Sequence, residues 1–135
     1  MNKEEIKAIL PHREPMLLVE EAYLNEDGSA TAYYDVRGDE FFLQGHFPGN
    51  PVVPGVILCE MMAQSCAVCL AEEKAAETYY TSLNNVRFRQ PVKPGDRVRC
   101  HCRITKARKP FYFAEGKVYV GDKLCAQGEF SFMLA

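Results

Sequence analysis

Two periods of apolar residues alternate along the chain, one typical of helices and one typical of strands. Residues 2–10 carry apolar side chains at helical spacing and end at Pro11, so they predict a short amphipathic helix. From Gly55 to about Glu77 the spacing is helical again, and residues 56–71 are apolar on nearly every side. This second run predicts a long helix that is buried over most of its surface, because it has no polar face.

The rest of the chain shows the period of two that strands require. The expected strands cover residues 16–24, 29–36, 78–88, 97–107, 111–120 and 123–134. The first two form a hairpin, and Asn84–Asn85 can interrupt the third. An apolar helix needs an apolar sheet face around it. The order of elements therefore predicts an α+β fold, in which a long antiparallel sheet curls round one central helix within a single domain of residues 1–135.

The composition is that of a globular protein without a membrane segment. Apolar residues make up 47% of the 135 residues, which is enough for a core. No N-terminal stretch has the pattern of a signal peptide. The longest apolar run is shorter than the ~20 residues of a membrane span, and it contains Glu60. We therefore expect a cytoplasmic protein that does not associate with membranes.

The six cysteines admit two interpretations. Cys66 and Cys69 lie three residues apart in the helical run, and Cys100 and Cys102 flank His101 in a strand-like run, so a zinc site is one alternative. Successive side chains of a strand point to opposite faces, so His101 would point away from both of its cysteine neighbours. The prediction is therefore reduced thiols in the core and no metal.

Charge is divided unevenly along the chain. Residues 1–77 hold 5 Lys or Arg and 14 Asp or Glu, a net charge of −9. Residues 78–135 hold 11 Lys or Arg and 4 Asp or Glu, a net charge of +7. Either these are two solvated faces, or the C-terminal strands present a positive surface to an acidic partner. No DNA-binding segment is recognisable, so a nucleic acid is not the expected partner.

Three residues near the start of the long helix carry candidate chemistry. His46 lies in a loop dense in Gly and Pro, residues 44–55, and is either structural or a base that accepts a proton. Glu60, the one charged side chain of the apolar run, is either satisfied by Gln64 four residues on or acts as a proton donor in a desolvated site. Gly55 combines a helix N-terminus with the lack of a side chain, which suits an oxyanion.

Other catalytic arrangements find no support in the sequence. Ser65 falls in the middle of the helical run, and neither a phosphate-binding loop nor a dinucleotide motif is present. The cysteines lack a convincing His partner. An acid–base pair of His and Glu suits elimination or hydration chemistry.

Three blocks of the sequence resemble one family of enzymes. They are GHFPGNP at residues 45–51, followed by PGV at 54–56, Glu60 and AQ at 63–64; LPHREPMLLV at 10–19; and VRFRQPVKPGD at 86–96. Together they are similar to the (3R)-hydroxyacyl-acyl carrier protein dehydratases of the FabZ type. The first block is the most specific, whereas the third occurs more widely among hotdog proteins. His12 and Arg13 also match this family, and we expect them to pack or form hydrogen bonds near an interface.

The resemblance implies a hotdog fold and obligate dimers, often assembled as a trimer of dimers. It implies dehydration of a β-hydroxyacyl thioester to the trans-2-enoyl product in fatty acid biosynthesis. His46 would be the base at the α-carbon, Glu60 would assist departure of the hydroxyl as water, and the N–H of Gly55 would hold the thioester carbonyl. His46 and Glu60 would meet across the dimer interface, and no metal or organic cofactor is implied.

The implied partner is an acyl carrier protein, which is acidic and bears the substrate on a phosphopantetheine arm. Candidates for a positive docking surface are Arg87, Arg89, Lys93, Arg108 and Lys109. A hotdog thioesterase and a non-catalytic acyl-binding module are the alternatives, and the pairing of His46 with Glu60 argues against both. Glu rather than Asp at position 60 favours this branch over the dehydratases that also isomerise the double bond. Chain-length preference, isomerase side activity, the choice between fatty acid synthesis and a specialised acyl pathway, and the choice between dimer and hexamer stay open.

Overall fold

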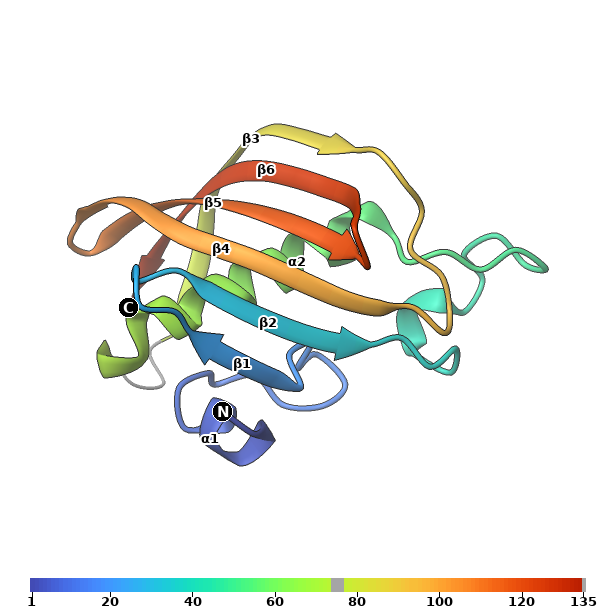
Figure 1. Ribbon diagram of the computed structural model, residues 1–135, viewed down its shortest axis with the longest axis horizontal. Coiled ribbons are helices and arrows are strands. Elements are labelled where there is room, and N and C mark those ends of the chain that lie inside the picture. The colour runs from blue at the N-terminus through green and yellow to red at the C-terminus, as the bar shows by residue number, and fades with distance from the viewer. Residues whose placement is uncertain (74–76, 135) are drawn as a thin grey trace.

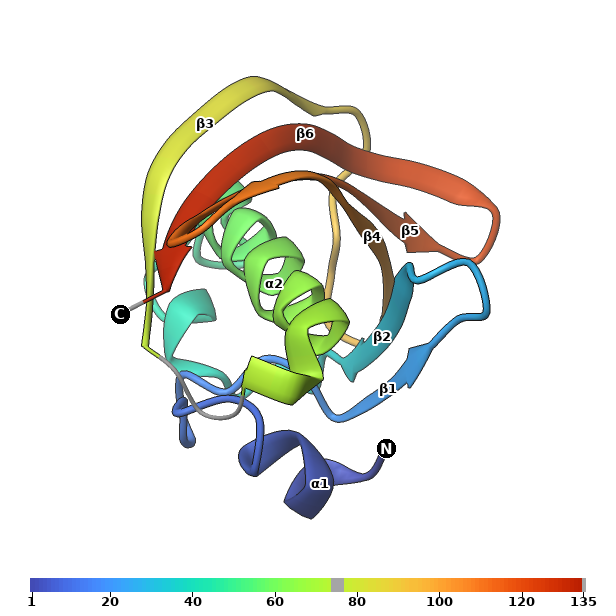
Figure 2. The ribbon, with the colours of Figure 1, turned by 90° about the vertical axis from the view of Figure 1, so that its left-hand side faces the viewer.

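A six-stranded antiparallel sheet curls round one helix, as the sequence predicts (Figure 1 and Figure 2). The computed structural model describes residues 1–73 and 77–134. The strands lie in the order β1-β2-β4-β5-β6-β3. Their bounds are β1 Glu21–Leu24, β2 Ala30–Asp35, β3 Thr78–Phe88, β4 Arg97–Arg108, β5 Phe111–Val120 and β6 Lys123–Leu134. The central helix is α2, Gly55–Ala67, and the architecture is the α+β hotdog fold.

Strand β4 shows how the alternating pattern produces a sheet with one covered face. Val98, Cys100 and Cys102 are at most 2% exposed and belong to the core that α2 shares with the sheet. Cys102 Sγ lies 3.3 Å from the backbone oxygen of Met62 on that helix. Both edges of β4 are paired, with β2 on one side and β5 on the other. The centre of the sheet is therefore tied to the helix, and Ile104 of β4 also packs against this core.

Gly116 of β5 allows the helix to lie close to the sheet. A Cβ atom at this position would be 3.1 Å from both Met62 Sδ and Cys102 Sγ. Both of those side chains are fully buried, so neither has space to move aside. A glycine is therefore favoured where α2 crosses β5.

Helix α2 is shorter than the sequence predicts. The α-helix ends at Ala67, and a 3-10 helix follows at Val68–Glu73. Ser65 Oγ donates to the carbonyl of Met61 at 2.7 Å, a local bond of the kind that bends helices. The prediction of one continuous α-helix is therefore wrong after Ala67, and residues 74–76 of that prediction lie outside the described residues. In the part of the chain that is described, no helix is long and apolar enough to cross a membrane.

Two of the predicted strands also need correction. β1 begins at Glu21, later than expected, because the N–H of Leu18 bonds to the side chain of Gln64 instead of to a neighbouring strand. β3 runs through Asn84–Asn85 without a break, but its register against β6 shifts there and Asn85 adopts a φ of 52°. Such a bulge bends and twists a strand. It accompanies the strong curl of β3 round the helix (Figure 2).

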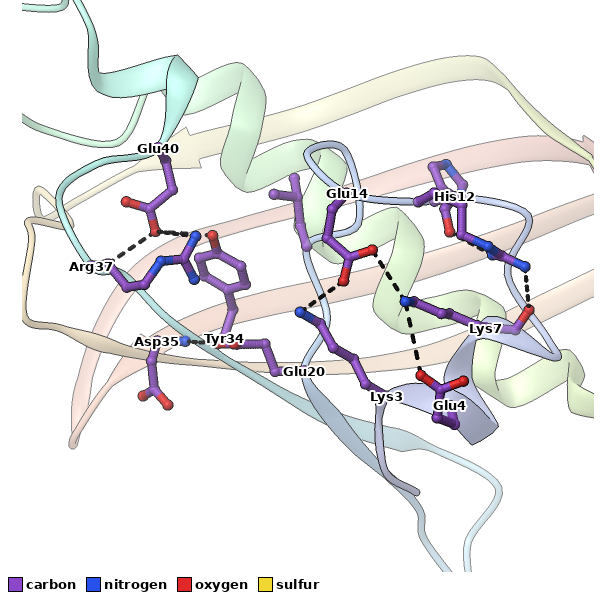
Figure 3. Close-up of polar contacts among 12 residues, drawn as sticks. Lys3, Glu4, Lys7, His12, Glu14, Glu20, Tyr34, Asp35, Arg37 and Glu40 are labelled. Carbon is purple, nitrogen blue, oxygen red and sulfur yellow. Dashed lines mark hydrogen bonds and ion pairs between the residues drawn. The ribbon is translucent and has the colours of Figure 1, made fainter.

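The N-terminal helix α1, Lys3–Lys7, packs beside β1. Asn2 caps it in a reciprocal arrangement with Glu5. In the loop that follows, Glu14 forms ion pairs with Lys3 at 3.0 Å and with Lys7 at 3.2 Å (Figure 3). The backbone N–H of Glu14, followed by these two lysines, lowers the pKa of the carboxyl group to about 2. The loop is thereby fastened to the helix that precedes it.

Candidate active site

His46 lies on a tight loop with an unusual backbone conformation. Gly45, Phe47 and Gly49 have φ angles of 77°, 58° and 84°, in the left-handed region that side chains disfavour. Phe47 carries a side chain, so its backbone is strained, and such positions cluster at functional sites. The N–H of Asn50 donates to the carbonyl of Phe47 at 2.8 Å and closes the turn. The loop therefore presents His46 on a short, fixed turn ahead of α2.

One ring nitrogen of His46 is already engaged by the loop. Nδ1 lies 2.8 Å from the backbone oxygen of Val52. A carbonyl oxygen can only accept, so we assign the proton of the neutral ring to Nδ1, which leaves a lone pair on Nε2. The ring also stacks on Phe47, with the centroids 4.4 Å apart. His46 is thus oriented with Nε2 ready to accept a proton, as a general base requires.

Glu60 lies on the side of α2 that the sheet leaves partly uncovered. Its side chain is 25% exposed in this chain. Oε2 accepts a hydrogen bond from Gln64 Nε2 at 2.8 Å and lies 3.4 Å from His12 Nε2. Among the described residues, Oε1 has no hydrogen-bond partner. A cavity of about 120 Å³ lies beside the carboxylate and is also lined by Thr78 and Tyr80.

Gln64 connects Glu60 to the N-terminal segment. Its side chain is fully buried, and its hydrogen bonds are all 2.8 Å long. Oε1 accepts from the N–H of Leu18, while Nε2 donates to the carbonyl of Met16 and to Glu60 Oε2. The pairing of Glu60 with Gln64 that the four-residue spacing predicts is confirmed. It occupies one carboxylate oxygen only, so it is compatible with chemistry at the other.

Gly55 is the first residue of α2. Among the described residues, no acceptor faces the N–H groups of Gly55 and Val56. Unpaired N–H groups and the helix dipole favour negative charge at this point. A Cβ atom at position 55 would lie 2.9 Å from the ring of Phe88 on β3, so glycine also permits that contact. Gly55 and Phe88 border a cavity of about 530 Å³, which Arg89 also lines.

His46 and Glu60 do not meet within one chain. In residues 1–73 and 77–134, the only hydrogen bond of the His46 ring is to Val52, and the polar contacts of Glu60 are with Gln64 and His12. Figure 1 shows the loop that leads into α2 projecting from the body of the molecule. His46 and Glu60, the predicted base and acid, therefore do not contact each other within a single chain.

The uncovered side of α2 is bordered by the edge of the sheet. β3 pairs with β6 on one side and with no strand of the described residues on the other. Leu83 on β3 is 46% exposed. Val56 on α2, predicted to be buried from the apolar run, is 75% exposed. Ala63 of α2 and Tyr80 of β3 line the cavity beside Glu60, so the two elements adjoin. An open strand edge next to an exposed apolar helix face is a surface suited to association.

The five cations predicted for a carrier surface lie at two ends of the sheet. Arg87 and Arg89 lie at the end of β3, and Lys93 lies in the turn that leads to β4. Arg108 and Lys109 lie at the far end of β4, where the chain turns into β5 (Figure 1). All five side chains are exposed. The structure therefore brings the first three to the end where α2 begins, and not the other two.

His12 and Arg13 are the residues whose role the sequence left open. His12 contacts Glu60, and its Nδ1 atom is buried without a hydrogen-bond partner among the described residues. Arg13 donates to the backbone oxygens of Lys7, Leu10 and His12 at 3.2, 2.9 and 2.7 Å. It therefore braces the turn after α1. Only the resemblance to the family motif pointed to His12 and Arg13 as candidate functional residues. Spacing along the chain does not reveal a contact between residues 12 and 60.

The cysteines and His101 lie on opposite sides of the sheet, as the alternation of side chains predicts. Cys100 and Cys102 belong to the core, whereas His101 lines a groove on the outer face with Arg103. Burial raises the pKa of the Cys100 thiol to about 12, as is typical of an inert thiol. Within the described residues, no three His, Cys, Asp or Glu side chains are grouped as a metal site requires.

Comparison with known proteins gives consistent matches over nearly the whole chain. A family model described as a FabA-like domain matches residues 10–129. The 3-hydroxyacyl-[acyl-carrier-protein] dehydratase FabZ of Caulobacter vibrioides is 41% identical, with 96% of this chain and 86% of that protein aligned. The protein of the same name from Alkaliphilus metalliredigens is 40% identical, with 99% and 94% aligned.

Solved structures support the same architecture. A chain of the dehydratase heterocomplex ApeI:P from Xenorhabdus doucetiae superposes with a TM-score of 0.84, covering 96% of this chain and 90% of that chain at 19% identity. The PaaI protein of E. coli superposes with a TM-score of 0.65, covering 84% and 81% at 16% identity. At these identities the likeness shows a shared fold alone.

Proposed function

The chain belongs to the FabA-like family, and from this premise we propose how a dehydratase of the FabZ type works with the residues described above. Its reaction is the removal of water from a 3-hydroxyacyl group carried by an acyl carrier protein, a hydro-lyase step of fatty acid biosynthesis. In our proposal the substrate is the (3R)-hydroxyacyl thioester and the product is the trans-2-enoyl thioester.

The hydrogen bond from His46 Nδ1 to the oxygen of Val52 carries the mechanistic proposal. It leaves Nε2 as the acceptor that removes a proton from the α-carbon of the thioester. The electrons of that C–H bond move toward the carbonyl, where the N–H of Gly55 stabilises the developing negative charge. The double bond then forms between the α- and β-carbons as the bond from the β-carbon to the hydroxyl breaks. Glu60, protonated on Oε1, donates the proton with which the hydroxyl departs as water, while the proton from the α-carbon stays on His46 Nε2. The only groups needed for these steps are an imidazole, a carboxyl group and a backbone N–H.

The smallest active unit in this proposal is a homodimer. Pairing of the open β3 edge with the same edge of a second copy would extend the sheet through a two-fold interface. The same approach would cover Val56 and the exposed face of α2. The loop that bears His46 projects from its own chain, and it would then reach Glu60 of the second copy. Assembly of three such dimers would leave each site within its dimer.

The acyl carrier protein is proposed to dock at the end of the sheet where α2 begins. Arg87, Arg89 and Lys93 gather there, and Arg89 lines the cavity beside Gly55. An arginine is well suited to the phosphate of the pantetheine arm, and the exposed cations suit an acidic carrier. The thioester would then enter beside the N-terminus of α2. Arg108 and Lys109 lie at the other end and have a weaker claim to this role.

An assay with the purified protein and a 3-hydroxyacyl-carrier substrate tests the reaction. We expect the ultraviolet absorbance of the conjugated enoyl thioester to appear, and the reverse hydration to occur with the enoyl substrate. Replacement His46→Ala is expected to reduce turnover by about 10²–10⁴-fold while the circular dichroism spectrum is retained. Release of free thiol without any change in the double bond would instead identify a thioesterase.

Mixed dimers test whether two chains share the site. We expect a mixture of His46→Ala and Glu60→Gln proteins, each with only a low residual rate alone, to regain activity, since one of the two sites in each mixed dimer combines an intact His46 with an intact Glu60. The formation of mixed dimers is verified with two different affinity tags. No activity in verified mixed dimers would place both residues of a site in one chain.

A further inference from the structure

The contacts of Glu60 indicate a role for a residue outside the His–Glu pair. Nε2 of Gln64 at 2.8 Å and Nε2 of His12 at 3.4 Å both approach the same carboxylate oxygen, Oε2. Oε1 has no partner in the part of the chain that is described. We infer that His12 is a positioning residue, which together with Gln64 fixes Oε2 so that Oε1 is presented to the hydroxyl of the substrate. This inference rests on the proposed function, in which Glu60 assists departure of that hydroxyl.

The surroundings of His12 determine which of its nitrogens carries the proton. Nδ1 is buried and has no hydrogen-bond partner among the described residues, whereas Nε2 faces the carboxylate of Glu60. A buried N–H without an acceptor is unfavourable, so the proton of the neutral ring belongs on Nε2. In that tautomer the imidazole donates toward Oε2.

The unpaired Nδ1 also argues against a role in packing alone. An apolar side chain of similar size would fill the same space without burying an unpaired nitrogen. The ring is therefore better explained by its contact with Glu60 than by the volume that it occupies. Buried polar atoms that lack partners call for such a specific explanation.

Two sets of contacts hold His12 in place. On one side, Arg13 binds the backbone oxygens of Lys7, Leu10 and His12 itself. On the other side, Gln64 binds the carbonyl of Met16 and the N–H of Leu18, which fastens the following segment to α2. Figure 3 shows His12 on the loop beyond Lys7, at the end of α1. The backbone is thus anchored on both sides of His12, which supports a residue that orients a catalytic carboxylate.

Loss of His12 should impair turnover more than binding. Glu60 would keep its bond to Gln64 but lose the second contact that limits rotation of the carboxylate. Misplacement of a reacting group by about 1 Å can cost about 10²-fold in rate. We therefore expect His12→Ala to lower kcat by about 10–100-fold, with KM within about threefold of the wild-type value.

Rescue and a double-mutant cycle distinguish positioning from a structural role. The amide nitrogen of glutamine can take the place of imidazole Nε2, so His12→Gln should recover most of the lost kcat. If His12 acts through Glu60, His12→Ala should change the residual rate of Glu60→Gln by less than about twofold, because effects of residues that act as a unit are not additive. His101→Gln, on the outer face of the sheet, is the matched control and should retain wild-type kcat.

The outcomes separate this inference from the proposed function. A wild-type protein that does not dehydrate the hydroxyacyl substrate refutes the proposed function, and the role of His12 in it. An active wild type with an equally active His12→Ala variant overturns the role of His12 alone. Equal fold-losses from His12→Ala in the wild-type and Glu60→Gln backgrounds, or failure of His12→Gln to restore kcat while the folded spectrum is retained, also overturn it.

Discussion

Replacement of Gln64 by leucine removes the hydrogen bonds that hold the N-terminal segment and Glu60 to the central helix. Leucine has a similar volume, so the change leaves little cavity behind. It removes the acceptor of the Leu18 N–H, the donor to the Met16 carbonyl and the donor to Glu60 Oε2. The variant therefore isolates the polar contribution of one buried side chain.

The expected loss of stability follows from the groups left without partners. Leu18 is 1% exposed, so water cannot replace the lost acceptor, and an unsatisfied buried N–H costs about 1–3 kcal/mol. Met16 is 40% exposed and the Glu60 side chain is 25% exposed, so these two groups can turn to water. Each of their lost bonds then costs about 0.5–1.5 kcal/mol. We expect a total decrease of about 2–6 kcal/mol in the free energy of unfolding.

Urea titration followed by circular dichroism measures this decrease. The titration is repeated at several protein concentrations, because association would make the apparent stability depend on concentration. Gln127→Leu is the matched control, since Gln127 lies on the outer face of the sheet and its side chain forms no hydrogen bond within the described residues. A loss below about 0.5 kcal/mol for Gln64→Leu, the range of ordinary surface substitutions, would refute the reasoning.

Two further predictions concern the polar contacts near the N-terminus and after β2. Asn2→Ala should lower the free energy of unfolding by about 0.5–2 kcal/mol in urea titrations, because it removes the cap of α1; unchanged stability would contradict this. Burial alone would raise the pKa of Glu40, but the N–H groups of Arg37 and Gly38 and the Tyr34 hydroxyl outweigh it and lower that pKa below 4.5 (Figure 3). The stability from this carboxylate is therefore present at neutral pH and is lost as the pH falls below about 4.5 toward the folded-state pKa. Glu40→Gln should destabilise the protein by about 1.5–3 kcal/mol at neutral pH, and the difference should narrow near pH ~3; an equal difference at both pH values would argue against this assignment.

Local pattern predicted the C-terminal strands well and the segments on either side of the active site less well. β5 and β6 have the predicted bounds, because β5 alternates between buried and exposed positions and Gly121-Asp122 marks the turn between the two strands. The segment before β1 is equally apolar, but the side chain of Gln64 captures the N–H of Leu18 and prevents strand pairing there. Apolar content likewise does not distinguish an α-helix from the 3-10 helix that follows Ala67. Before β1, a contact with a residue elsewhere in the fold therefore decided the local structure.

The site itself could be predicted where its chemistry is local in sequence. His46, Gly55 and Glu60 lie within one stretch of loop and helix, whereas the Nδ1 contact of His46 and the approach of His12 to Glu60 depend on how segments pack.

Sequence likewise could not predict which of the five candidate cations lie together on the surface. Sequence grouped Arg108 with Arg87 by sign alone, but β4 has 12 residues and, at about 3.3 Å per residue, spans about 40 Å. Exposed charges farther apart than about 10 Å are largely screened at 0.1 M ionic strength. Cations at the two ends of β4 therefore act independently, and a carrier that delivers its thioester beside Gly55 would be attracted by Arg87, Arg89 and Lys93 rather than by Arg108.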